Sequence, residues 1–286
     1  GTPNATITYT VDGGANQTIL LDATGNASVT TPVLTANSTY NLVSVASATT
    51  PVCNNTASGS VTITVNALPI ANVTANTICS GTTGTVSFTG TANAVVTYTV
   101  DGGANQTVTL DASGNASVTT PVLTVNSTYA LVSVTTTATP ICSQAQTASA
   151  TVTVTALPTA SISGSTTICS GSTAVISFTG TANSVVTYTV DGGANQTITL
   201  DATGNASVTT PALTTNSTYA LVSVTATTTP ACTNTASGSA VVTVLPLPTS
   251  AISGATTICS GATAVVSFTG TPNATITYTV DGGANQ

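Results

Sequence analysis

The stretch TYTVDGGANQ, residues 8–17, decides the fold, and it returns unchanged at 97–106, 187–196 and 277–286. Alternating β-forming residues run into Asp-Gly-Gly, and the alternation resumes after it. Asp-Gly between alternating runs is a strong hairpin signal, because a tight turn needs positive φ values that glycine adopts freely. We therefore expect a β-hairpin at each copy. In the second and third copies the residues of the expected turn are Asp101, Gly102, Gly103, Asp191, Gly192 and Gly193.

The hairpin recurs at a fixed period of 89 or 90 residues, which indicates an array of similar domains. This spacing separates the aspartates of the four hairpins, which are Asp12, Asp101, Asp191 and Asp281. The same spacing separates three Leu-Pro pairs that begin at Leu68, Leu157 and Leu247. We predict two whole repeats between two partial ones, with bounds 1–67, 68–156, 157–246 and 247–286. Because residues 270–286 repeat residues 1–17 without a change, we expect the sequence to be a window on a longer array.

Each repeat is predicted to hold seven short strands and no helix. Val, Ile, Thr and Tyr alternate at period two, as in half-buried strands, and turn signals separate the runs. In the third repeat the expected strands are Thr159–Ser163, Ala174–Thr179, Val185–Val190, Thr197–Leu200, Ala206–Thr209, Thr218–Thr225 and Ser237–Val244. A turn is expected at Ile168–Gly171. The prediction is all-β: tandem immunoglobulin-like β-sandwich repeats of about 90 residues, forming a rod.

The aromatic residues are interpreted as core. Each whole repeat has one Phe and two Tyr at equivalent places inside apolar strand patterns. They are Phe88, Tyr98 and Tyr129, then Phe178, Tyr188 and Tyr219. The alternative is a platform on which carbohydrate rings stack, but no aromatic residue is left over for an exposed face.

The composition excludes several classes of function. The chain has no Lys, Arg or His, and its only charges are seven Asp. Without cations it has no means of neutralising phosphates, so nucleic acid is excluded as a partner. A serine nucleophile would find no His or Lys as a base, and no Gly-x-Ser-x-Gly motif occurs. We therefore predict no enzyme, no catalytic residue and no cofactor.

The aspartates are expected to shape turns. Asp101 and Asp111 are ten residues apart with a strand between them, so they cannot act as one acid/base pair. They also do not fit an EF-hand loop, and we predict no metal site. A calcium ion held between neighbouring domains is the alternative.

Six cysteines fall at two places per repeat, which favours structural disulfides in an oxidising compartment. The early site is a Cys-Ser-Gly turn and the late site lies near the last hairpin. The preferred pairing is within repeats, Cys79–Cys142 and Cys169–Cys232, each across 63 residues. An immunoglobulin topology places the two sites at opposite ends, however, and that would favour a bond between neighbours, Cys79 to Cys232. Free buried thiols are the third alternative.

Three stretches carry a family resemblance. They are LPTASISGSTTICSG at 157–171, TYALVSV at 218–224 and Pro-Ala-Cys at 230–232. They resemble immunoglobulin-like repeats of very large surface proteins of Bacteroidota that the type IX system secretes, such as the SprB-like gliding motility adhesins. The resemblance implies an extracellular filament attached to the outer membrane. Adhesive regions and the anchoring signal would lie outside these residues.

Two hypotheses about function follow. The first is a structural stalk or filament of a cell-surface adhesin, which holds a distal adhesive region away from the cell for gliding or attachment. Its partners would be neighbouring repeats, other stalks bundled laterally, and the outer-membrane anchoring machinery through regions not present. The second is a ligand-binding module for glycan, ice or calcium, repeated for avidity.

Overall fold

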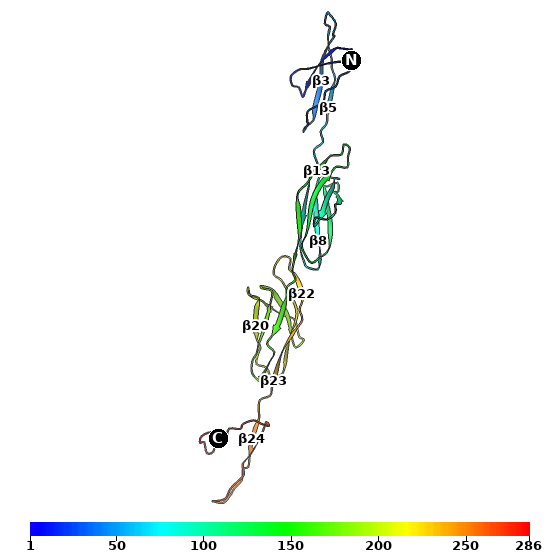
Figure 1. Ribbon diagram of the computed structural model, residues 1–286. Coiled ribbons are helices and arrows are strands. Elements are labelled where there is room, and N and C mark those ends of the chain that lie inside the picture. Colours follow the sequence, from blue (N-terminus) through cyan, green and yellow to red (C-terminus); the bar gives the residue numbers. More distant parts are fainter. The chain divides into compact units, whose positions relative to one another are not determined.

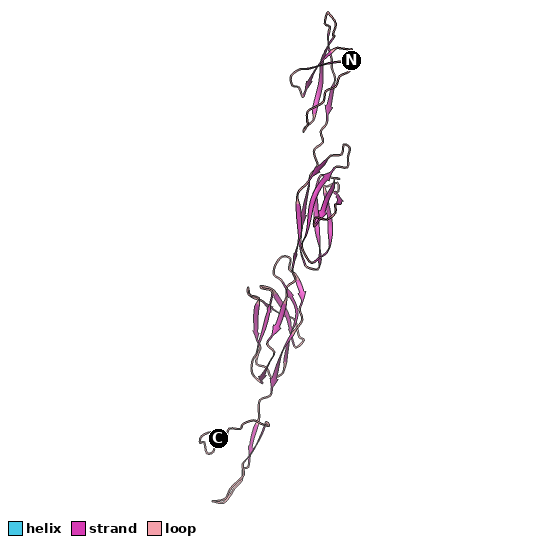
Figure 2. Cartoon of the chain, viewed as in Figure 1, coloured by secondary structure: helices cyan, strands magenta, loops and turns pink.

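Strands are the only regular elements in the computed structural model, which describes all 286 residues (Figure 2). No helix exists that could cross a membrane. The chain forms two compact units. The first comprises Gly1–Asn76, Thr83–Pro121 and Asn126–Thr153, and the second comprises Thr77–Thr82, Val122–Val125 and Val154–Gln286.

The repeat 157–246, coloured green to yellow in Figure 1, is a sandwich of two sheets. Its strands are β15 (Ala160–Ser163), β16 (Thr166–Cys169), β17 (Val175–Gly180), β18 (Val185–Val190), β19 (Gln196–Thr199), β20 (Asn205–Thr209), β21 (Ser217–Thr225), β22 (Thr233–Thr235) and β23 (Ser239–Leu245). One sheet has the order β15-β17-β20 and the other β16-β23-β21-β18-β19, with β22 paired to β21. The first two strands thus join opposite sheets, and β16 runs parallel to β23.

The repeat 68–156 has the same order of strands in its two sheets. The strands are β6 (Ala71–Ala75), β7 (Thr77–Cys79), β8 (Thr82–Gly90), β9 (Val95–Val100), β10 (Gln106–Thr109), β11 (Asn115–Leu123), β12 (Ser127–Thr135), β13 (Ser143–Ala145) and β14 (Ser149–Thr155). The sheets have the orders β11-β8-β6 and β10-β9-β12-β14-β7, and β13 pairs with β12. The expectation of an all-β, immunoglobulin-like sandwich is confirmed.

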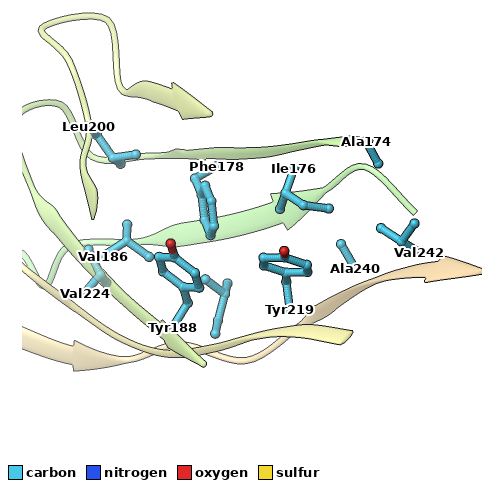
Figure 3. Close-up of a cluster of buried hydrophobic side chains, with 11 residues drawn as sticks. Ala174, Ile176, Phe178, Val186, Tyr188, Leu200, Tyr219, Val224, Ala240 and Val242 are labelled. Carbon is cyan, nitrogen blue, oxygen red and sulfur yellow. The ribbon is translucent and has the colours of Figure 1, made fainter. Parts of the chain in front are cut away.

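The core lies between the two sheets. In Figure 3, Phe178 and Ile176 of β17 point toward Tyr188 and Tyr219 of the opposite sheet. The rings of Phe178 and Tyr188 have centroids 4.9 Å apart, and both side chains are buried. The Tyr188 hydroxyl donates a hydrogen bond to Gln196 Oε1 at 3.1 Å. Burial raises the pKa of Tyr188, with a smaller contribution from Tyr219. The aromatic residues are core, as predicted, and no carbohydrate platform is formed by them.

The Asp-Gly-Gly hairpin is confirmed. Asp191 and Gly192 have φ values of 51° and 70°, the positive values that a type I′ turn requires at both central residues. The Gly193 amide donates to the Val190 carbonyl at 2.9 Å and closes the turn. β18 then pairs antiparallel with β19, with Val186 opposite Ile198.

The two partial repeats each contain only part of a sandwich. Residues 1–67 form a single sheet, β2-β1-β3-β4 with β5 paired to β3, from β1 (Thr6–Val11), β2 (Gln17–Leu20), β3 (Ser38–Ala46), β4 (Asn54–Thr56) and β5 (Ser60–Ile63). Residues 247–286 contain only the pair β24 (Ser250–Ser253) and β25 (Ser267–Gly270). The inner faces of both parts therefore lack the second sheet that covers them in whole repeats.

Two strands were not predicted. β16 occupies residues expected to lie before or inside a turn, and the turn begins only at Ser170. β22 lies in a stretch expected to be loop. Both strands are three or four residues long, too short to show an alternation of apolar and polar residues. β16 places Cys169 at the end of the sandwich, opposite Leu245.

Candidate functional site

One disulfide in the second unit joins residues of two successive repeats. Cys79, the last residue of β7 in the repeat 68–156, is bonded to Cys232 in the repeat 157–246. The bond joins positions 153 residues apart, with Cα atoms 5.5 Å from each other. We take this covalent joint as the candidate functional site, because it ties a repeat to its successor through a covalent bond.

Hydrogen bonds fix the turn that follows Cys79. The Ser80 amide donates to the Thr155 carbonyl at 2.9 Å, and the Gly81 amide donates to the Leu123 carbonyl at 2.8 Å. The Thr82 hydroxyl donates to the Cys79 carbonyl at 2.7 Å. Gly81 has a φ of 83°, so a side chain at this position would be strained. The Cys-Ser-Gly motif is thus held at the end of β14, just before the Leu-Pro linker.

The other half of the joint lies in the last hairpin of the following repeat. Cys232 is fully buried, and its carbonyl accepts a hydrogen bond from the Ala226 amide at 2.8 Å. It follows the cis peptide bond Thr229–Pro230. Two residues further on, Asn234 Nδ2 donates to the carbonyl of Pro158 at 3.0 Å. The last hairpin therefore makes two connections. The disulfide of Cys232 joins it to the preceding repeat, and the side-chain amide of Asn234 joins it to the Leu-Pro linker.

The preferred within-repeat pairing, Cys79–Cys142 and Cys169–Cys232, is wrong. The ends of β12 explain why: Ser127 pairs with Val152 near the turn of Cys79, whereas Thr135 pairs with Ser143 beside Cys142. At about 3.3 Å per residue the two ends are roughly 26 Å apart, far beyond the ~7 Å between Cα atoms that a disulfide can bridge.

In the repeat 157–246 the two cysteines also lie at opposite ends of the sandwich. Cys169 lies opposite Leu245 at one end of the sandwich, and Cys232 lies beyond the Thr225–Thr233 pair at the other end. The opposed ends that the immunoglobulin topology implies are thus real, and the alternative pairing between neighbours, Cys79–Cys232, is the one present.

Four thiols are free. Cys53, Cys169 and Cys259 are exposed, and Cys142 is partly exposed. Cys142 and Cys53 occupy the late position of their repeats, as Cys232 does, and each Sγ lies 3.7–3.8 Å from the carbonyl of the proline two residues before it. Cys169 and Cys259 occupy the early position, as Cys79 does. The free cysteines therefore occupy the same two positions of the repeat as the two halves of the joint.

The turn aspartates accept hydrogen bonds from backbone amides and so shape the turns, as expected. In the hairpin of the third repeat, Asp191 Oδ1 accepts from the Thr218 amide at 2.7 Å and Oδ2 accepts from the Ser217 hydroxyl at 3.0 Å. Asp101 makes the same contacts with Thr128 and Ser127. Gly102, Gly103, Gly192 and Gly193 complete these turns. No cluster of three or more potential metal-ligating side chains exists.

The second turn of the hairpin uses its aspartate differently. Asp201 Oδ1 accepts from the Thr203 hydroxyl at 2.7 Å, from the Thr203 amide at 2.8 Å and from the Asn205 amide at 2.9 Å. These donors lower the pKa of Asp201, the Thr203 hydroxyl most of all. At Asp22, in the corresponding turn, the pKa is lowered chiefly by the Asn26 amide. Both carboxylates thus stabilise a loop by accepting hydrogen bonds from it.

Comparison with known proteins gives information about the fold alone. No protein-family model matches the chain, and no curated protein matches it either. Among solved structures, the human OSCAR ligand-binding domain matches at 15% identity and a TM-score of 0.28 over 58% of this chain and 95% of that one. A marsupial T cell receptor matches at 11% identity and a TM-score of 0.27 over 68% and 78%.

A Salmonella alpha-2-macroglobulin reacted with methylamine also matches, at 13% identity and a TM-score of 0.29. The match covers 88% of this chain and 22% of that one. These likenesses are weak, and they carry no information about function.

Proposed function

We propose that these repeats are the structural stalk of a cell-surface adhesin, in the manner of the type IX-secreted adhesins of Bacteroidota. The stalk would hold a distal adhesive region away from the cell and carry tension during gliding or attachment. Its anchoring to the outer membrane would depend on regions outside these residues. Neighbouring repeats are its first partners, and lateral contacts between stalks would be a second kind.

The observation that carries the proposal is the covalent joint. A disulfide between Cys79 and Cys232 makes the chain a closed loop across most of two repeats. Tension applied to the two ends would pass through this bond and bypass residues 80–231. A joint of this kind resists extension even when the sandwiches it spans are destabilised, which suits a load-bearing part. The bond also fits an extracellular location, because disulfides persist in oxidising compartments.

The linker supports the same proposal. Pro158 is buried, and its carbonyl accepts the bond from Asn234. The Thr159 amide donates to the Thr181 hydroxyl at 3.0 Å. The Leu-Pro segment is thus fixed onto the repeat that follows it. A segment held in this way suits a spacer.

Single-molecule stretching of the 286-residue chain tests the proposal. With the bond intact, extension should omit the bypassed segment, and reduction should release roughly 500 Å of additional length for the 153-residue span. After reduction we expect two unfolding steps of equal size, one for each whole repeat. Cys232→Ser should extend fully without reductant. Equal extension of the natural chain with and without reductant would rule out the load-bearing joint, and a calcium-dependent melting shift would favour a binding module instead.

A further inference from the structure

The outer face of the three-stranded sheet β11-β8-β6 carries a shallow groove. Strand pleating sends alternate side chains to opposite faces, so the neighbours of the buried Phe88 in β8 point outward. Figure 3 shows the equivalent Phe178 pointing into the core of its own repeat. Two depressions of about 370 Å³ and 300 Å³ make up the groove, and Thr89 of β8 lines both of them. The first extends over β6 and the second over β11.

A row of polar side chains crosses the groove. Asn72 of β6 lies opposite Thr89 of β8. Asn115 continues the row on β11, the strand that pairs with the other side of β8. Neighbouring strands lie about 4.8 Å apart, so the row crosses roughly 10 Å of the sheet, which is comparable to the length of a disaccharide.

Several hydrogen-bonding groups of this row are available to a ligand. The side chains of Asn72 and Thr89 are exposed and make no hydrogen bond within the chain. At the β11 end, Asp111 uses Oδ1 to accept from the amides of Ser113 and Asn115, which leaves Oδ2 as a free acceptor. The groove thus offers an amide that donates and accepts, a carboxylate that accepts and a hydroxyl that can do both.

One apolar side chain borders the row. Ile70 is 65% exposed, yet its main chain is fixed. Its amide donates to the Thr91 hydroxyl at 3.0 Å, and its carbonyl accepts from the Thr91 amide at 2.9 Å. Gly90 permits this close approach, because a Cβ there would lie 2.2 Å from the Ile70 carbonyl oxygen. Ligand sites commonly combine such an apolar contact with a few polar groups that fix the orientation of the ligand.

The repeat 157–246 differs on one side of this groove. A depression of about 290 Å³ over β17 and β20 matches the β11 side. On the other side, Thr159 stands in place of Ile70, and Ser161 stands in place of Asn72. The hydroxyls of Ser161 and Thr179 are 2.7 Å apart and hydrogen-bond each other, so they satisfy one another. The chain therefore contains a natural comparison for the groove of the repeat 68–156.

We propose that the groove of the repeat 68–156 binds a neutral oligosaccharide. The Asn72 amide and the Thr89 hydroxyl bond the hydroxyls of the sugar, Asp111 Oδ2 accepts from a further hydroxyl, and Ile70 contacts the apolar face of a ring. The chain has seven Asp and no Lys, Arg or His, so an acidic sugar would meet repulsion without a compensating cation. This binding site adds an activity to the stalk and does not depend on its load-bearing role.

Saturation-transfer difference NMR on the 286-residue chain tests the proposal. The probes are the neutral disaccharides maltose, cellobiose, lactose and diacetylchitobiose at millimolar concentration, and digalacturonate is the acidic comparison. We expect saturation transfer to at least one neutral disaccharide and none to digalacturonate. Absence of transfer to every neutral probe would overturn the proposal, and so would equal transfer to digalacturonate.

Exchanges between the two repeats locate the site. Ile70→Thr combined with Asn72→Ser gives this groove the residues of the other repeat and should weaken binding by at least about tenfold. The reciprocal pair, Thr159→Ile with Ser161→Asn, should raise the number of probe molecules bound per chain. Val122→Ala also exchanges an exposed residue between the repeats, but outside the groove, and should leave binding unchanged.

All the substituted side chains are exposed, so the melting temperatures of the variants should equal that of the natural chain. A loss of binding then reports on the groove and not on unfolding. Undiminished binding by the variant with Ile70→Thr and Asn72→Ser would overturn the proposal. Binding is measured without tension and does not involve the disulfide, so its outcome is separable from that of the stretching experiment.

Discussion

Asp191 and Thr218 are joined by a reciprocal pair of hydrogen bonds. The carboxylate of Asp191 accepts from the Thr218 amide at 2.7 Å, and the Asp191 amide donates to the Thr218 carbonyl at 2.8 Å. The tip of one hairpin is thereby tied to the first residues of β21, 27 positions later. The same pair recurs at Asp12 with Thr39 and at Asp101 with Thr128. Asp191, which the sequence predicts only to form a turn, therefore also links this hairpin to β21 by two hydrogen bonds. We call this pair of bonds the clamp.

Removing this clamp should destabilise the repeat 157–246. Asp191→Ala deletes two charge-assisted hydrogen bonds and leaves the buried Ser217 hydroxyl without its acceptor, at a cost of about 2–4 kcal/mol in the free energy of unfolding. Urea denaturation measures it. Asp281→Ala is the matched control, because Asp281 has the same φ of 51° but lies outside any complete sandwich. Equal effects at both positions would show that the loss comes from backbone strain alone.

Gly192 and Gly204 allow the cost of backbone strain to be distinguished from the cost of a steric clash. A Cβ on Gly204 would lie 2.2 Å from the Gly180 carbonyl oxygen, whereas a Cβ on Gly192 would meet nothing within 4 Å. Both residues have positive φ, so each substitution by alanine costs about 1 kcal/mol in strain. Gly204→Ala should cost at least about 2 kcal/mol more, because backbone must move to relieve the overlap. Thermal or urea unfolding of the two variants compares them directly, and similar losses would refute the close approach.

The two equivalent phenylalanines should respond differently to truncation. Phe178 is fully buried against Tyr188, and Phe178→Ala should destabilise its repeat by about 3–5 kcal/mol. Phe268 is partly exposed in a segment without a second sheet. Phe268→Ala should therefore change the unfolding of the whole repeats by less than about 0.5 kcal/mol. Urea denaturation of both variants in the same buffer measures the difference. A large effect of Phe268→Ala would mean that residues 247–286 belong to a folded core.

Loss of the joint should uncouple the repeats. Cys232→Ser opens a loop of 153 residues, and the loop-entropy relation gives up to about 5 kcal/mol for such a closure. We expect a lower urea midpoint than in the natural chain, and the same midpoint as the natural chain in reductant. Cys259→Ser, which alters a free thiol, is the control and should leave the midpoint unchanged. Insensitivity of the natural chain to reductant would argue that the bond is absent in solution.

Acid should weaken the fold through Asp22 and Asp201. Their pKa values are lowered in the folded chain, so the ionised forms are favoured by folding. The stability that they contribute is complete above the ordinary aspartate pKa of 3.8 and is lost as the pH falls through the lowered values. Asp201→Asn should flatten the acid limb of a plot of melting temperature against pH between about 5 and 2. Thr203→Val, which removes the strongest donor, should shift that limb toward higher pH without abolishing it.

Much of the fold could be predicted from the sequence, because its signals are local. The Asp-Gly turn needs particular φ values, and the alternation of Ile176, Phe178, Val186 and Tyr188 assigns each side chain to a face. β16 could not be predicted in this way. Its four residues become a strand only because β23 lies beside them, and β23 is more than 70 residues later.

The candidate site was harder to predict. The sequence shows two cysteines per repeat, but it does not show which ends of the strands they occupy. The pairing follows from the antiparallel course of β12 and β14, which sends Cys79 and Cys142 to opposite ends. The opposed ends could be anticipated once an immunoglobulin topology was assumed, and the preference for pairing within a repeat was wrong. No sequence motif predicts the hydrogen bond from Asn234 to the Pro158 carbonyl of the linker.

The wide spacing of the joint also has a consequence for the order in which it can form. A polypeptide that enters an oxidising compartment with its amino terminus first exposes Cys79 long before Cys232 arrives. The Cys79 thiol must stay reduced while its own sandwich folds and while most of the next one emerges. The repeat 68–156 is therefore closed by a bond to its successor, and that bond can form only after most of the repeat 157–246 has been delivered.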